Sequence, residues 1–170
     1  MTEPALVVTA PLPGTVLPMA EVPDPVFAGS LVGAGVAVDP DLDAGVLDAV
    51  APVEGRLLKV HPHAFIVLHP SGRGVLVHLG IDTVKLEGTP FTLHAAEGDQ
   101  VAAGDRVVSM DVAAVRAAGM SPVTPVVVMD AKAETVPPVE SGAAVATGDV
   151  LFTWPAGSWR PPGEPGTAIG

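Results

Sequence analysis

Short runs of aliphatic residues, each ended by glycine or proline, follow one another along most of the chain. The 170 residues include 19 Gly and 19 Pro, and runs such as 75–79, 123–129 and 150–154 are dominated by valine and leucine. Such runs favour strands, and the turn residues between them keep the strands short. The crossover helices of a parallel α/β sheet are missing, so the pattern predicts an all-β fold. We expect an antiparallel β-sandwich or flattened barrel with one or two short helices.

The turn and cap residues place the expected elements along the chain. Asp111 is suited to cap a helix that runs to Ala118, and Gly119 can end it. The segment from Val22 to Gly35 is expected to be a loop with at most one helical turn near Phe27, and residues 39–48 an exposed acidic loop. Strands are expected within the ranges 6–19 (two strands around a turn at 11–14), 36–38, 51–60, 63–68, 75–79, 106–110, 123–129 and 150–154.

Two sequence patterns each occur twice. One pattern is Ala10-Pro11-x-x-Gly14, which recurs as Ala51-Pro52-x-x-Gly55. The other is Gly98-x-x-Val101-x-x-Gly104-Asp105, which recurs as Gly142-x-x-Val145-x-x-Gly148-Asp149. Neither occurs a third time, which argues against a solenoid. The repeats therefore predict two similar β motifs packed together.

The charge and cysteine content exclude several function classes. The formal net charge is −11 with eight Lys and Arg, so nucleic acid and anionic membrane surfaces would be repelled. The absence of cysteine excludes disulfides and thiolate metal sites. No basic segment precedes an apolar stretch near Glu3, which argues against a secretory signal. The uncharged stretch at 25–38 is too short and too rich in glycine to span a bilayer. We therefore expect a cytoplasmic protein with no direct membrane insertion.

Two histidines are the candidates for chemistry. His63 and His78 lie in predicted strands joined by a turn at 70–74, and antiparallel pairing would place them at roughly opposed positions on one face. Two imidazoles could bind a metal ion if a carboxylate such as Asp82 completed the ligand set. Alternatively, one ring nitrogen could carry a phosphoryl group, with backbone N–H groups near Gly80 as additional donors. No nucleotide-binding loop is present, so the phosphoryl group would come from another protein.

Two other interpretations compete with these. A purely structural β-domain would bury 75–84 as a core strand with a satisfied histidine and use Asp82 as a turn residue. A lipoyl or biotin carrier would present one lysine at a hairpin tip beside a methionine, and the nearest sequence, Met129-Asp130-Ala131-Lys132, matches that pattern poorly.

The spaced motifs together resemble the glucose-type enzyme IIA domain of the bacterial phosphoenolpyruvate-dependent sugar phosphotransferase system. The likeness runs in order through residues 5–153. It is carried by Ala10-Pro11-Leu12-x-Gly14, Val22-Pro23-Asp24-x-Val26-Phe27-Ala28, Val32-Gly33-x-Gly35, Ala51-Pro52-Val53-x-Gly55, His63-Ala64-Phe65, Val77-His78-x-Gly80-Ile81-Asp82-Thr83-Val84, Gly104-Asp105 and Thr124-Pro125-Val126-Val127.

The resemblance implies a phosphocarrier subunit without a cofactor, a phosphotransferase component that acts through a phosphohistidine intermediate. It implies that His78 accepts the phosphoryl group from the phosphocarrier HPr and passes it to a IIB domain of a separate sugar permease. His63 would stabilise the phosphoryl group, Asp82 and the backbone of Gly80 would support the site, and the loop with Val26 and Phe27 would dock the partners. The domain would span residues 1–155, followed by a flexible Pro/Gly-rich tail at 156–170.

One departure and one alternative accompany this resemblance. The family has a threonine two residues before the first histidine, whereas this chain has His61. The alternative function is a regulatory binding protein, because in some relatives the dephosphorylated IIA binds permeases or metabolic enzymes. In some of those complexes a zinc ion bridges the two histidines, which correspond here to His63 and His78, although the proposed phosphoryl transfer requires no metal.

Overall fold

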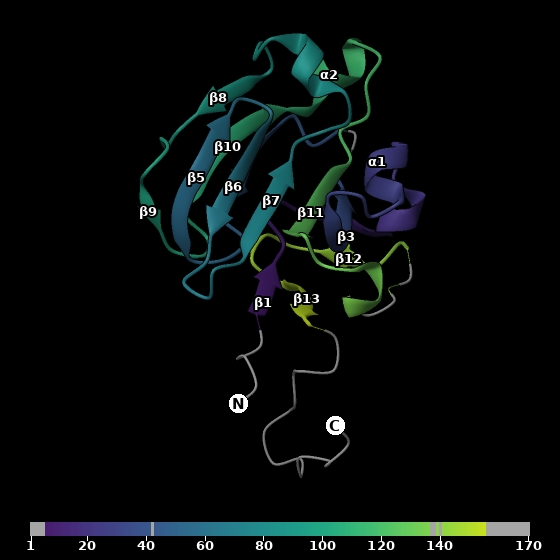
Figure 1. The fold of residues 1–170 in the computed structure, drawn as a ribbon. Coiled ribbons are helices and arrows are strands. Elements are labelled where there is room, and N and C mark those ends of the chain that lie inside the picture. Colours follow the sequence, from purple (N-terminus) through teal and green to yellow (C-terminus); the bar gives the residue numbers. More distant parts are fainter. Residues whose placement is uncertain (1–5, 42, 137–138, 140, 156–170) are drawn as a thin grey trace, which may run out of the picture.

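A computed structural model describes residues 6–155 apart from 42, 137–138 and 140 (Figure 1). Most of its elements are short strands, and its two α-helices span 4 and 6 residues. The elements in chain order are β1 (Leu6–Thr9), β2 (Gly14–Pro18), η1 (Met19–Glu21), α1 (Pro25–Ala28), β3 (Gly33–Asp39), β4 (Val46–Val50), β5 (Gly55–His61), β6 (Ala64–Leu68), β7 (Gly74–His78), η2 (Thr83–Leu86), β8 (Phe91–Leu93), β9 (Gln100–Val101), β10 (Arg106–Asp111), α2 (Val112–Ala117), β11 (Thr124–Met129), η3 (Ala133–Thr135), β12 (Ala144–Val145) and β13 (Val150–Trp154).

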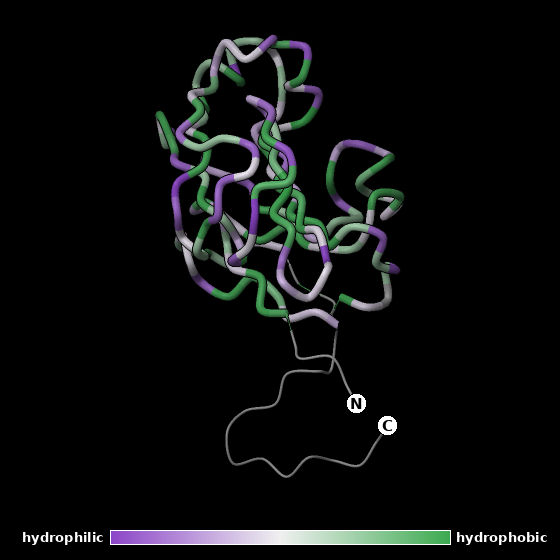
Figure 2. The backbone as a smooth tube through the Cα atoms, turned by 60° about the vertical axis from the view of Figure 1, so that its left-hand side comes forward, coloured by the Kyte–Doolittle hydropathy of each residue, from purple (hydrophilic) through white to green (hydrophobic). Residues whose placement is uncertain are grey.

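The strands form three antiparallel sheets around one large core. The main sheet has eight strands in the order β12-β2-β3-β11-β7-β6-β5-β9, and smaller sheets are formed by β4-β10-β8 and β1-β13. The inner faces of these sheets enclose fully buried side chains such as Leu57, Phe65 and Met110. Figure 2 shows hydrophobic stretches running together through the middle of the molecule. The predicted all-β, antiparallel fold is confirmed.

The two repeated sequence patterns meet in space. Gly14 pairs with Val145 at one edge of the main sheet, and Gly55 pairs with Val101 at the other edge. The two Ala-Pro turns also exchange equivalent backbone hydrogen bonds. The N–H of Thr9 donates to the carbonyl of Pro52 (3.0 Å), and the N–H of Val50 donates to the carbonyl of Pro11 (2.8 Å). The prediction of two similar β motifs packed together is therefore confirmed.

A second, smaller core lies on the outer face of the main sheet. The connection from β2 to β3 carries η1 and α1 across this face, where Phe27 is buried with Ala37, Val127 and Ile81. The side chain of Asp24 accepts hydrogen bonds from the backbone N–H groups of residues 26 and 27, which fixes the first turn of α1. The predicted single helical turn near Phe27 is confirmed.

Several predicted boundaries are wrong. The strand expected at 36–38 is the seven-residue β3, and β4 begins inside the stretch 39–48 that was expected to be a loop. The two strands expected within 6–19 are present, and β1 pairs with β13 while β2 pairs with β3 and β12. The predicted tail, 156–170, lies outside the described residues. In the part of the chain that is described, no helix is long and apolar enough to cross a membrane.

Candidate functional site: a cluster of three histidines

His78 ends the central strand β7 on the outer face of the main sheet. Val75 and Val77 point into the core, whereas Leu76 and His78 point outward and are half-buried. The Nδ1 of His78 lies 2.6 Å from the carbonyl oxygen of Gly80. A carbonyl can only accept, so Nδ1 carries the proton and Nε2 keeps a free lone pair.

His63 lies beside His78, although not for the reason that the sequence suggested. The pairing of β6 with β7 is as predicted, but its register places Ala64, not His63, opposite His78. His63 belongs instead to the two-residue turn with Pro62 that joins β5 to β6, so the alternation of a strand does not set its side-chain direction. Its carbonyl accepts from the N–H of Leu79 at 2.7 Å, which ties this turn to the end of β7.

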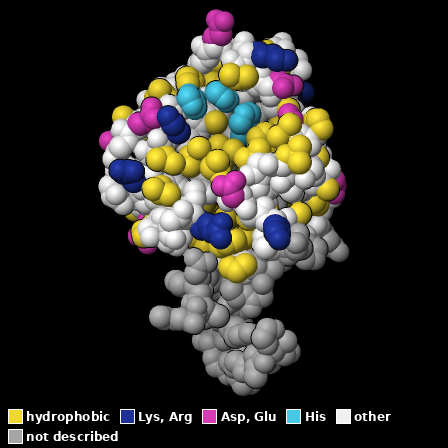
Figure 3. All heavy atoms as spheres, in the orientation of Figure 1, with side chains coloured by type: hydrophobic (Ala, Val, Ile, Leu, Met, Phe, Trp, Pro, Cys, Tyr) yellow, Lys and Arg dark blue, Asp and Glu magenta, His cyan; other side chains and the backbone are white. Residues whose placement is uncertain are grey.

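The rings of four side chains form a continuous row. The ring of Phe27 lies 5.1 Å from that of His78, and the ring of His63 meets His78 edge-on at 5.2 Å and 75°. The ring of His61 stacks against that of His63 at 5.8 Å and 26°. Histidine side chains gather among hydrophobic ones on the face seen in Figure 3.

A tight turn after β7 holds the carbonyl that fixes His78. Gly80 has φ +82°, a conformation that favours glycine, and a Cβ there would lie 2.5 Å from Cγ2 of Thr83. The hydroxyl of Thr83 donates to the carbonyl of Leu79 (2.6 Å), and the N–H of Ile81 donates to the carbonyl of Ser121 (2.9 Å). The carbonyl of Gly80 thus contacts the histidine, and the expected donation from backbone N–H groups near Gly80 to a phosphoryl group stays a prediction.

Burial keeps both inner histidines neutral near pH 7. Desolvation, and then the nearby rings of His78 and His61, lower the pKa of His63 to about 4. Burial also lowers the pKa of His78, against the hydrogen bond to Gly80 and the charges of Asp24 and Asp82, which raise it. Asp82 is exposed, with φ +61°, and acts on His78 through its charge. A neutral imidazole with a free Nε2 is a nucleophile, so the arrangement is suited to covalent transfer on His78.

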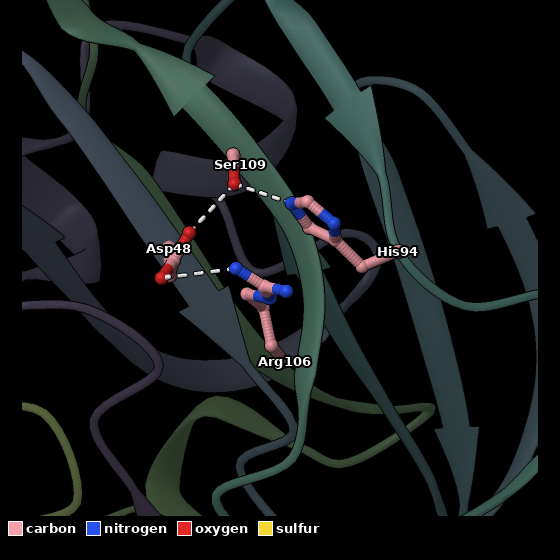
Figure 4. A network of polar contacts seen from close by, with 4 residues as sticks. All are labelled: Asp48, His94, Arg106 and Ser109. Atoms are coloured by element: carbon pink, nitrogen blue, oxygen red, sulfur yellow. Dashed lines mark hydrogen bonds and ion pairs between the residues drawn. The ribbon is translucent and has the colours of Figure 1, made fainter.

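The other two histidines lie away from this cluster. His69 accepts from the N–H of Ser71 (3.1 Å) within the turn between β6 and β7. His94 belongs to a polar network on the three-stranded sheet (Figure 4). There the hydroxyl of Ser109 donates to Asp48 (2.6 Å) and accepts from Nε2 of His94 (2.6 Å), while Arg106 lies 3.8 Å from Asp48.

Three features of the site were missed by sequence reasoning. Asp24 was seen only as part of a motif, yet its charge acts on His78, and its position before Pro25 in a cap pattern was an available signal. Leu31, 75% exposed, is an apolar surface residue on the same connection as Val26, which is 44% exposed. The stacking of His61 on His63 depends on the hairpin and had no sequence signal.

Within the described residues, no group of three or more His, Asp or Glu side chains is placed to hold a metal ion.

Comparison with known proteins places the chain in a family. The family model described as phosphoenolpyruvate-dependent sugar phosphotransferase system, EIIA 1, matches residues 6–134. The chain belongs to this EIIA family. The PTS system glucose-specific EIIA component of Bacillus cereus is 39% identical to this EIIA over 143 residues, which are 83% of this chain and 84% of that protein. This EIIA is therefore a phosphocarrier component of a sugar phosphotransferase system, as the resemblance implied.

A solved structure and a longer relative extend this comparison. The glucose permease IIA from Mycoplasma capricolum is 34% identical, with a TM-score of 0.78, and the match covers 89% of this EIIA and 96% of that chain. The PTS system glucose-specific EIICBA component of Streptococcus pneumoniae is 47% identical over 116 residues, which are 67% of this EIIA and 15% of that protein. The fold of this EIIA is thus the fold of a solved IIA protein.

Proposed function

We propose that this EIIA accepts a phosphoryl group on Nε2 of His78 from phosphorylated HPr and passes it to a IIB domain of a sugar permease in the cytoplasm. The observation that carries the proposal is the 2.6 Å contact between Nδ1 of His78 and the carbonyl of Gly80. It holds the proton on one nitrogen and leaves the other, Nε2, as the nucleophile. Family membership supplies the system in which such a nucleophile acts.

In the first step the lone pair of Nε2 attacks the phosphorus of phosphohistidine on HPr. The new P–N bond forms as the old one breaks, and the nitrogen of the leaving imidazole keeps the bonding pair. The ring of His78 retains its Nδ1 proton and gains positive charge. The Gly80 carbonyl and the carboxylates of Asp24 and Asp82 stabilise that charge, since the same three groups favour the protonated ring.

In the second step a nucleophile of the IIB domain attacks the same phosphorus, and Nε2 of His78 recovers its electron pair. His63 is neutral and can donate one ring N–H to the phosphoryl oxygens while the bond between phosphorus and Nε2 of His78 breaks. We expect His63→Gln to accept the phosphoryl group but to fail in passing it on. Normal onward transfer by this variant would remove the role proposed for His63.

The partners would dock on the apolar surface around the histidines. Val26 and Leu31 lie exposed on the β2–β3 connection, and Val84 is exposed after the turn that follows β7. Phe27 is only 8% exposed and its ring contacts that of His78, so it would support this surface from the buried side. Aromatic and aliphatic residues of this kind form the cores of protein interfaces.

The test is phosphorylation with labelled phosphoenolpyruvate, enzyme I and HPr, followed by mass spectrometry of the modified residue. We expect label on His78 in the wild type and in His69→Ala, a matched loss of a histidine outside the cluster. His78→Ala should remain unlabelled. Label retained in His78→Ala would show that another residue accepts the phosphoryl group.

A further inference from the structure

The two inner histidines of the site are held in different ways. His78 has a hydrogen bond to the Gly80 carbonyl and the ring of Phe27 against its side. The ring of His63 makes no hydrogen bond to any described residue. Its ring contacts are a T-shaped one with His78 and a stacked one with His61. The orientation of His63 therefore depends on its neighbouring rings.

His61 is well placed to hold that orientation. It is the last residue of β5, and its backbone is paired with Ala64 across the hairpin. Its position is thus fixed by the sheet, whereas His63 lies in the two-residue turn. The two rings are 26° from parallel, so the flat side of His61 limits rotation of the His63 ring. The electrostatic effect of His61 on the pKa of His63 agrees with this close approach.

We propose that His61 is a positioning residue, whose ring face keeps His63 edge-on to His78 for phosphoryl transfer. This inference rests on the proposed function, because it concerns the residue that is proposed to stabilise the phosphoryl group. A hydrogen-bond donor that is displaced by a fraction of an ångström loses much of its effect on a transition state. The role requires a flat ring at position 61 and uses neither ring nitrogen.

The experiment compares His61→Ala with His61→Phe in transfer from the phosphorylated protein to a IIB domain. We expect His61→Ala to slow this transfer about three- to tenfold, the effect of losing one ring contact. His61→Phe retains a flat ring and should stay within about twofold of the wild type. Thermal unfolding checks that each variant is folded.

Two results would overturn the inference. They are unchanged transfer in His61→Ala and equal losses in the Ala and Phe variants. A separate NMR measurement needs no phosphoryl group. Cross-peaks between the rings of His63 and His78 should weaken in His61→Ala and persist in His61→Phe, and their persistence in both would also contradict it. Absence of label on wild-type His78 would instead contradict the proposed function.

Discussion

The two halves of the eight-stranded sheet share a framework, but the histidine cluster forms at one end only. The pairing of β6 with β7 ends with Ala64 opposite His78, and the pairing of β3 with β11 ends with Gly33 opposite Met129. Since β7 and β11 are antiparallel neighbours at the centre of the sheet, these two ends lie at opposite edges of the strands. Met129 thus holds the place in one half that His78 holds in the other.

The connections explain the difference between the halves. Between β5 and β6 lies a turn of Pro62 and His63, whereas between β2 and β3 the chain runs through residues 19–32 with η1 and α1. The longer connection crosses the outer face and brings Phe27 to His78, so both halves contribute to one site. The same strand framework therefore occurs in both halves. The residues of the site come from one strand end and from two connections of unequal length.

The largest expected effect separates the two equivalent strand ends. His78→Gln removes the proposed nucleophile and should reduce phosphoryl acceptance from HPr to background. Met129→Leu changes the equivalent position of the other half by a swap of similar volume, so acceptance should stay within about twofold. Both rates are measured with labelled phosphoenolpyruvate. A comparable loss in Met129→Leu would mean that the two ends are not functionally distinct.

The turn that follows β7 gives the next effect. In Gly80→Ala the added Cβ meets Thr83 and the residue must keep φ +82°, so the carbonyl that holds His78 should move. We expect phosphoryl acceptance to fall about tenfold or more. Gly98→Ala is the matched control, because Gly98 has φ +93° with open space around it. If acceptance fell equally in both variants, backbone strain rather than the His78 contact would be responsible.

The half of the sheet that carries the histidine cluster should also make the free energy of unfolding depend on pH. The pKa of His63 is about 4 in the folded protein and 6.5 as its ordinary value, so the unfolded chain binds more protons between these limits. The contribution of neutral His63 to the free energy of unfolding is therefore complete above pH 6.5 and is lost as the pH falls toward 4. Urea unfolding at pH 7 and pH 5 should therefore show a smaller decrease for His63→Gln than for the wild type. Equal decreases would contradict the burial of a neutral His63.

The smallest effect concerns the polar network on the three-stranded sheet. Ser109→Ala leaves Asp48 and His94 without their shared hydroxyl and should lower the free energy of unfolding by about 1 kcal/mol. Phosphoryl acceptance should be unchanged, because this network is separate from the row of rings at His78. A drop in acceptance without a drop in stability would connect the network to the site.

Much of the fold could be predicted from local patterns. The strand at 150–154 was placed correctly, and Asp111 caps α2 through the N–H of Ala114 as expected. The strand β3 was underestimated because Gly33 and Gly35 suggested a loop. In the structure, a Cβ at either position would clash with the backbone of β11, so these glycines allow the two strands to approach.

The candidate site was only partly predictable for a related reason. The sequence predicts that His63 and His78 lie close together, and they do. Their contact, however, comes from a two-residue turn and not from the alternation of side chains along a strand. Which nitrogen of His78 is free depends on the path of the backbone at Gly80, and local sequence patterns do not specify that path.

The most direct test is to identify the phosphorylated nitrogen of His78 by ¹⁵N NMR of the labelled phosphoprotein. The contact of Nδ1 with the Gly80 carbonyl predicts a phosphoryl group on Nε2. A phosphoryl group on Nδ1, or on the ring of His61 or His63, would contradict this account of the site.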